Sequence, residues 1–244
     1  MTKKTTIAAV GDIHMNQSQH GKWKTIFEEV SPKAKVLLLC GDLTDTGDEE
    51  EAEMLVTELQ HLKVPVIAVL GNHDYEKGRQ KQIRQILTDS KVTVLDGEAI
   101  VVAGIGFAGV KGFGGGFDRY MLSMFGEDAM KSFVQEAVNE SLLLDRALAR
   151  LEQEYTDIKK VALLHYAPIA ETVVGEPKEI YPFLGSTHLM EPLQRRNVTA
   201  AFHGHAHAGK FKAQSPAGIP IYNVAVPVLK AHHGDDTSFA LIDI

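Results

Sequence analysis

The sequence repeats one local pattern that restricts how the chain can fold: a short apolar run leads into polar side chains able to bind metals. The clearest copy is residues 65–75, PVIAVLGNHDY. Its apolar half predicts a buried strand, and Gly71 falls where that strand must end in a turn. Asn72, His73 and Asp74 then place an amide oxygen, an imidazole and a carboxylate on this tight turn.

The same pattern recurs at other predicted strand ends. The other junctions are GDIH at 11–14 after residues 5–10, GDLTD at 41–45 after 34–40, His165 after 160–164, and HGHAH at 203–207 after 198–202. One copy alone is also typical of a helix cap beside a surface histidine. Because every copy follows a predicted strand, we expect the side chains to converge at the carboxyl ends of the strands. His205 and His207 can reach two adjacent ions from an extended turn, whereas His203 is expected to point into the body.

The length suits one large α/β domain or two small ones, and the charge argues against a protein that tracks nucleic acid. The chain has 244 residues, of which 44% are hydrophobic and 23% charged, so it can bury a substantial core. No linker composition interrupts it, and we predict a single domain over residues 1–244. The net charge of −7 and the lack of basic clusters argue against extended nucleic acid as a partner. An anionic substrate remains compatible, because bound divalent metals reverse the local field.

The start of the chain and its cysteine content predict a cytoplasmic protein. The opening residues, MTKKTTIAAVGDIH, contain too short an apolar stretch for a signal peptide or a membrane span. Cys40 is the only cysteine, which excludes an intrachain disulfide and favours a reducing compartment.

Two segments, residues 104–120 and 175–186, are candidates for selecting a substrate. The glycines at the start of the first lack the context of a dinucleotide-binding or P-loop motif and indicate a mobile loop. Arg119 is a candidate clamp for a substrate phosphate, with a local surface ion pair as the alternative. The second segment predicts a loop over the site, in which Tyr181 and Phe183 either stack on an aromatic leaving group or pack against the body.

The end of the chain reads as strands at 209–215, 219–224 and 238–244. His232 and His233 are expected on the loop before the last strand. They either line the outer part of the site or lie on the surface, and a surface role is favoured.

Taken in chain order, GDIH, GDLTD, GNHD, a later histidine and GHAH resemble the motifs of the calcineurin-like metallophosphoesterase superfamily, over residues 11–207. The resemblance implies an α/β fold, a four-layer αββα sandwich of two mixed sheets flanked by helices. It also implies a binuclear metal site. The implied ligands are Asp12, His14 and His207 for one metal, Asn72, His165 and His205 for the other, and Asp42 as the bridge.

The resemblance implies hydrolysis of a phosphodiester or phosphomonoester by a hydroxide held between two metals. Oxygen and nitrogen ligands without thiolate suit Mn, Fe or Zn. Two cations about 3.5 to 4 Å apart can clamp phosphoryl oxygens and lower the pKa of a shared water. His73 would then stabilise the phosphoryl charge or protonate the leaving oxygen, with Asp74 orienting its ring. Asn72 is also a candidate substrate-binding residue.

Alternatives to a small-molecule phosphoesterase are less well supported by the sequence. The protein Ser/Thr phosphatase branch typically carries Asp-Arg-Gly where this chain has Asp45-Thr46-Gly47, and Glu where it has Asp74. A non-catalytic scaffold would be expected to lack ligands or His73. The predicted substrate is therefore a small phosphate ester, such as a nucleotide, and a phosphodiesterase is favoured over a monoesterase. The oligomeric state is not predicted.

Overall fold

The apolar runs of the sequence become the inner strands of two sheets in a computed structural model that describes residues 4–244. Strands covered on both faces need apolar side chains along their whole length, which explains runs such as VLLLC. The first sheet has 5 strands in the order β11-β1-β2-β3-β4. Its strands are β1 (Thr6–Val10), β2 (Val36–Cys40), β3 (Val66–Val69), β4 (Val92–Val94) and β11 (Ala240–Asp243). The pairs from β1 to β4 are parallel, and β11 is antiparallel to β1.

The second sheet has 6 strands in the order β5-β6-β7-β8-β10-β9. Its strands are β5 (Glu98–Val102), β6 (Ile105–Gly109), β7 (Lys159–Leu163), β8 (Ala200–His203), β9 (Lys212–Gln214) and β10 (Pro220–Asn223). The inner strands β6, β7, β8 and β10 are parallel to one another, and the edge strands β5 and β9 are antiparallel to their neighbours.

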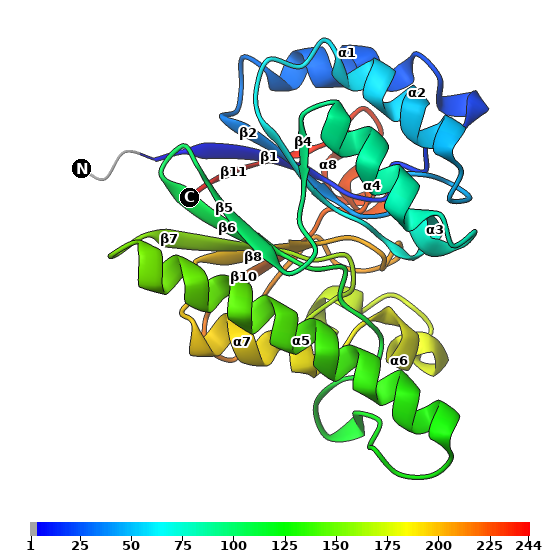
Figure 1. Cartoon of the computed structure of the whole chain (residues 1–244), viewed down its shortest axis with the longest axis vertical. Coiled ribbons are helices and arrows are strands. Elements are labelled where there is room, and N and C mark those ends of the chain that lie inside the picture. The colour runs from blue at the N-terminus through cyan, green and yellow to red at the C-terminus, as the bar shows by residue number, and fades with distance from the viewer. Residues whose placement is uncertain (1–3) are drawn as a thin grey trace.

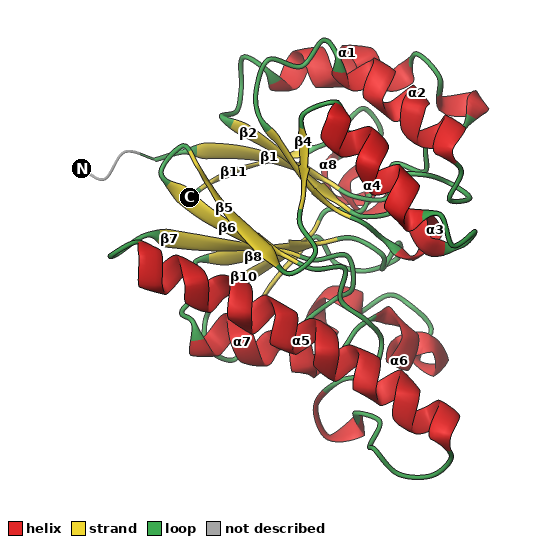
Figure 2. Cartoon of the chain, viewed as in Figure 1, coloured by secondary structure: helices red, strands yellow, loops and turns green. Residues whose placement is uncertain are grey.

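Helices cover the outer faces of both sheets, so the molecule has four layers (Figures 1 and 2). The first sheet is covered by α1 (Lys22–Val30), α2 (Glu49–Leu59) and α4 (Gln80–Asp89), and the second by α5 (Asp128–Glu154) and α7 (Met190–Arg195). Shorter helices are α3 (Asn72–Tyr75), α6 (Tyr181–Leu184) and α8 (Val226–His233), and 3-10 turns occupy Gln17–Gln19, Asp118–Tyr120, Ala170–Val173, Lys178–Ile180 and Thr187–Leu189. The predicted αββα sandwich of two mixed sheets is confirmed.

Large and small side chains alternate along the strands of the second sheet and belong to different parts of the core. Phe107 and Phe202 lie in the same buried cluster as residues of the first sheet, whereas their neighbours Ala108 and Ala201 belong to the cluster beneath α5 and α7. Successive side chains of a strand point to opposite faces, so large residues fill the space between the sheets and small ones let the helices approach.

Residues 104–116 are not the mobile loop that their glycines indicate. Residues 105–109 form β6, a fully buried strand in the interior of the second sheet. A Cβ atom on Gly106 would lie 2.9 Å from Leu151 of α5, and one on Gly109 would lie 2.7 Å from Val69 of β3. These glycines allow close packing against other elements, which glycine in a strand often signals.

The predicted loop before the last strand is also wrong, because residues 226–233 form α8. Pro227 near its start is compatible with the first turn of a helix. His232 and His233 therefore lie in the last turn of α8, where the ring of His232 stacks on Phe211 at a centroid distance of 4.7 Å. Both histidines are exposed, as a surface role requires.

No helix among residues 4–244 is both long enough and apolar enough to cross a membrane.

An ion pair between α5 and α7 should make stability depend on pH. Arg196 donates from Nε and Nη2 to Asp145, each at 2.9 Å, and these bonds lower the pKa of Asp145 below its ordinary value of 3.8. A depressed carboxyl pKa adds stability above the unfolded value and loses it as pH falls through the folded value. We expect Asp145→Asn to cost about 1 kcal/mol of unfolding free energy at pH 7.

Urea unfolding at several pH values tests this contribution. The difference between wild type and Asp145→Asn should shrink as pH falls below 3.8, the ordinary pKa of the group. Asp235→Asn is the control, because Asp235 makes no ion pair among residues 4–244. A difference that stays constant down to the most acidic pH would contradict the assignment.

Candidate metal centre

The polar junctions of the sequence meet at one edge of the sandwich. Parallel neighbours end at the same edge of a sheet, so β1, β2 and β3 bring their following turns together, and β7 and β8 do the same in the second sheet. Side chains from both sheets form clusters with metal-ligand spacing there: Asp12, His14 and His207; His14, Asp45 and His73; and Asp42, His165 and His205. Within each cluster, the candidate ligand atoms lie within 4.8 Å of one another.

The first predicted metal position brings Asp12, His14 and His207 together. His207 Nε2 lies 3.0 Å from Asp12 Oδ1. Burial alone would raise the pKa of Asp12, but the bond to His207 and the neighbouring imidazoles lower it. The same bond raises the pKa of His207. The hydrogen bond thus favours an ionised Asp12 carboxylate beside the His207 imidazole.

The second predicted position brings Asn72, His165 and His205 together beside Asp42. His165 Nε2 lies 2.8 Å from Asn72 Oδ1 and 3.3 Å from Asp42 Oδ1. The other oxygen of Asp42 lies 3.9 Å from His14 Nε2, in the first group. Asp42 is 2% exposed and stands between the two groups, as a bridging carboxylate must.

His14 and His205 have properties expected of metal ligands. Nδ1 and Nε2 of His14 are buried, yet neither has a hydrogen-bond partner within residues 4–244. An unpaired buried polar atom is costly and calls for a ligand. Burial, followed by the neighbouring His165, lowers the pKa of His205 to about 3, so this imidazole is neutral as a metal ligand must be. Cys40 is fully buried and burial raises its pKa, which leaves an oxygen and nitrogen donor set.

Local backbone geometry explains the glycines beside the predicted ligands. A Cβ atom on Gly71 would overlap Asp42, one on Gly204 would overlap Asp12, and one on Gly41 would overlap the ring of His165. Only glycine therefore lets each carboxylate or imidazole pack directly against the neighbouring turn.

Four of the predicted ligand positions have a strained backbone. Asp12, His14, Asp42 and His205 have φ angles of 59°, 47°, 49° and 68°, in the left-handed region that non-glycine residues rarely adopt. Such conformations cost of order 1–3 kcal/mol each and cluster at functional sites. The fold thus maintains an unfavourable backbone in order to aim these side chains.

His73 stands beside both groups without belonging to the predicted ligand set. Its Nδ1 donates to the carbonyl oxygen of Asp45 at 2.6 Å, which leaves Nε2, 3.9 Å from Asp42 Oδ2, on the side of the ligands. Its ring centroid lies 4.5 Å from that of His14. Burial opposes protonation of His73, but the bond to Asp45 and the charge of Asp42 raise its pKa overall.

Asp74 does not orient the ring of His73, contrary to the role predicted for it. Its fully buried carboxylate accepts bonds from the backbone of Leu43, Thr44 and Gly71 and from the hydroxyl of Thr44, at 2.6 to 3.2 Å. Burial and the charge of Asp42 raise the pKa of Asp74 to about 6, while these donors oppose that shift. Asp74 ties the turn after β2 to the turn after β3, and the Asp45 carbonyl holds His73.

Removing the Asp74 carboxylate should destabilise the protein. Asp74→Ala leaves buried donors without an acceptor, at a cost of about 1–3 kcal/mol for each group, so a loss of at least about 3 kcal/mol is expected. Urea unfolding of the metal-free protein measures it, with Asp89→Ala as the exposed control. A loss no greater than that of the control would contradict this structural role.

The structure adds contributors that the sequence did not reveal. Asp45 shares a cluster with His14 and His73, and its position at the end of GDLTD was the available signal. The carbonyl of Phe183 lies 3.0 Å from His205 Nε2 and so fixes which nitrogen faces the ligand groups. Backbone carbonyls carry no sequence signal, since any residue supplies one.

The predicted substrate-binding side chains are less closely associated with the ligand groups. Arg119 is exposed and donates to the Tyr120 hydroxyl at 2.6 Å, outside the ligand clusters. Tyr181 packs edge-on against Phe117, while Phe183 is 58% exposed. The Phe183 ring also packs edge-on against Phe133, at a centroid distance of 6.0 Å, and the Phe183 carbonyl contacts His205.

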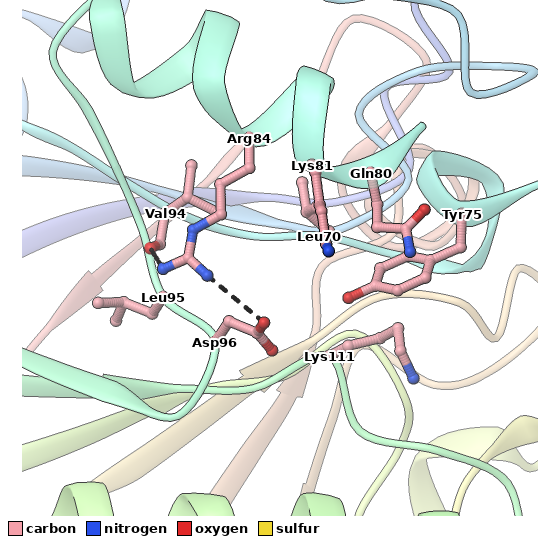
Figure 3. A pocket seen from close by; sticks show the side chains of 9 residues that line it. All are labelled: Leu70, Tyr75, Gln80, Lys81, Arg84, Val94, Leu95, Asp96 and Lys111. Carbon is pink, nitrogen blue, oxygen red and sulfur yellow. Dashed lines mark hydrogen bonds and ion pairs between the residues drawn. The ribbon is translucent and has the colours of Figure 1, made fainter. Parts of the chain in front are cut away.

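A cavity of about 220 Å³ adjoins the ligand groups (Figure 3). Leu70, two residues before Asn72, lines it, and so does Lys111, whose carbonyl accepts the N–H of His165 at 2.9 Å. None of the predicted metal ligands lines this cavity. It is therefore a neighbouring space and not the metal centre itself.

Comparisons with known proteins agree with the fold and the motifs. Phosphopantetheinyl hydrolase (PptH) from Mycobacterium tuberculosis has a similar structure, with a TM-score of 0.69 and 15% sequence identity over 99% of this chain and 97% of that chain. TT1561 of Thermus thermophilus has a TM-score of 0.58 and 15% identity over 99% of both chains. A search of curated proteins finds no match. The family model for calcineurin-like phosphoesterases matches residues 5–209, and the chain therefore belongs to the calcineurin-like phosphoesterase family.

Proposed function

We propose that this protein is a binuclear metal-dependent phosphoesterase that hydrolyses a phosphodiester or phosphomonoester. The observation that carries the proposal is the position of Asp42 between two groups of oxygen and nitrogen donors. One group contains His14, whose ring nitrogens have no hydrogen-bond partner within residues 4–244. Asp12, His14 and His207 would hold one metal, and Asn72, His165 and His205 the other. Two ions of Mn, Fe or Zn, when bound, would supply Lewis acidity toward the phosphoryl group and an activated water.

His73 is the proposed catalytic residue. Its Nδ1 hydrogen is committed to the Asp45 carbonyl, so Nε2 is the atom available to a substrate. A proton on Nε2 would be donated to a phosphoryl oxygen or to the leaving oxygen. Holding the ring by a backbone carbonyl fixes both its orientation and the nitrogen that carries the transferable proton.

Asn72 is proposed to serve both metal and substrate. Its Oδ1 faces His165 at 2.8 Å, which leaves the amide N–H₂ of the same side chain to donate to a phosphoryl oxygen.

Donors from both sheets form the proposed centre, which supports our description of residues 1–244 as one domain. The proposed substrate is a small phosphate ester, such as a nucleotide, which is compatible with the net charge of −7 because bound divalent metals would reverse the local field. A cytoplasmic location remains a prediction.

A non-catalytic scaffold is the competing function, and the ligand clusters together with His73 argue against it. Hydrolysis of bis-p-nitrophenyl phosphate beside p-nitrophenyl phosphate by the manganese-reconstituted protein tests the proposal. Faster diester cleavage, which we expect, assigns a phosphodiesterase, and the reverse assigns a monoesterase. Two bound metals with no cleavage of either ester would support the scaffold.

A further inference from the structure

Several polar and charged side chains line the cavity beside the predicted metal centre, together with Leu70, Val94 and Leu95. Its side chains include Tyr75 from α3, Gln80, Lys81 and Arg84 from α4, Asp96 after β4, and Lys111 after β6. Figure 3 shows the hydroxyl of Tyr75 and the ammonium of Lys81 pointing into the space between α4 and Lys111. Convergent polar groups in a cavity are typical of a ligand site.

Most charges around the cavity already have partners, but that of Lys81 does not. Arg84 pairs with Asp96 at 3.4 Å and with Glu98 at 2.7 Å. Lys111 is buried, donates to the Gly112 carbonyl at 2.6 Å, and lies 3.7 Å from Glu140. Lys81 has no ion-pair partner in the described part of the chain. Its positive charge is therefore available to a ligand.

Two neutral groups of the lining are also without partners. The Tyr75 hydroxyl has no hydrogen-bond partner within residues 4–244, and burial together with nearby carboxylates raises its pKa, so it remains a donor. Gln80 Oε1 is one of only three buried side-chain polar atoms without a partner in residues 4–244, and the other two belong to His14. A residue of the cavity lining thus carries an unpaired buried polar atom, as His14 does in the predicted metal centre.

We propose that the cavity binds a small organic anion, with its negatively charged group between Lys81 Nζ and the Tyr75 hydroxyl. The side-chain amide nitrogen of Gln80, which Figure 3 shows on the Tyr75 side, would donate a hydrogen bond to the same ligand. One water occupies about 30 Å³ in the liquid, so about 220 Å³ holds a phosphate-sized group and several further atoms.

The cavity is coupled to the centre by short covalent and hydrogen-bonded links. Tyr75 lies two residues after His73 on the same short helix. The Lys111 carbonyl accepts the N–H groups of His165 and Tyr166, at 2.9 and 3.1 Å. The anion is either a second charged group of the substrate or a separate molecule. The first of these sources rests on the proposed function, whereas binding itself does not.

Location of a selenate ion tests binding without any need for catalysis. Crystals of manganese-loaded protein soaked in sodium selenate should show anomalous density within hydrogen-bond reach of Lys81 Nζ and Tyr75 Oη. We expect the density in wild type and in the charge-matched control Lys24→Met, an exposed lysine outside the cavity, but not in Lys81→Met. No density in the wild-type cavity, or equal density in Lys81→Met, would overturn the proposal.

Kinetics then distinguish the source of the anion. If the anion belongs to the substrate, Lys81→Met should lower kcat/KM about tenfold on adenosine 3′,5′-bisphosphate but not on adenosine 5′-monophosphate, because a charge-assisted hydrogen bond is lost. If the anion is separate, added sulfate should change the rate on both substrates in wild type and Lys24→Met, but not in Lys81→Met. Lys81→Met kinetics identical to wild type in every assay would make the bound anion adventitious and overturn the proposal.

Discussion

Replacing Asp42 by asparagine is expected to lower kcat by on the order of 10³, the scale of several kcal/mol that metal ions supply to a transition state. The carboxylate lies between the two ligand groups, 3.3 Å from His165 Nε2 and 3.9 Å from His14 Nε2. Asparagine keeps the shape and the oxygen that accepts the His73 backbone N–H at 2.9 Å, but it removes the negative charge that two cations would share.

Metal analysis and steady-state kinetics measure the Asp42→Asn effect together. We expect fewer than two metals per chain at a manganese concentration that saturates wild type. Asp89→Asn, an exposed carboxylate on α4, controls for the loss of one charge. Full metal content with kcat within a few-fold of wild type would exclude Asp42 as the bridge.

Replacing His73 by alanine is expected to lower kcat by on the order of 10² or more while both metals stay bound, which is the usual scale for a general acid. The imidazole is held by the Asp45 carbonyl and is not one of the predicted ligands, although it lies in a cluster with His14 and Asp45. Its loss should therefore affect the chemical step and leave the metal content unchanged.

The contrast between the two variants separates catalysis from metal binding. His61→Ala is the matched control for His73→Ala, because His61 is an exposed histidine that faces Glu28 at 3.8 Å. Near-normal turnover of His73→Ala would remove its catalytic role, and loss of metals would make it a ligand.

The strand-end residues could be assigned from sequence because each one follows an apolar run. Apolar runs indicate buried parallel strands, and neighbouring parallel strands end at a common edge of their sheet. The motifs that follow these strands, GDIH, GDLTD, GNHD and GHAH, therefore indicate the residues of the site. Within the first sheet this places Asp12 near Asp42, and within the second it places His165 near His205; the structure then groups Asp42 with His165 and His205.

What the sequence missed depends on contacts between distant residues. The glycines of β6 read as a flexible loop, because their packing partners, Leu151 and Val69, come from α5 and β3. Asp74 lies beside His73 in sequence, but its carboxylate accepts hydrogen bonds from the backbone N–H groups of Leu43 and Thr44 in the turn after β2. Only the folded structure reveals these donors. The cavity at Lys81 likewise needs α3, α4 and the end of β6 to meet.

Titration of the metal-free protein with Mn(II), with hydrolysis of bis-p-nitrophenyl phosphate followed at each addition, tests the central claim most directly. A binuclear centre predicts no activity without metal and a rate that reaches its maximum at two equivalents per chain. Activity in the metal-free protein, or a maximum at one equivalent, would contradict it.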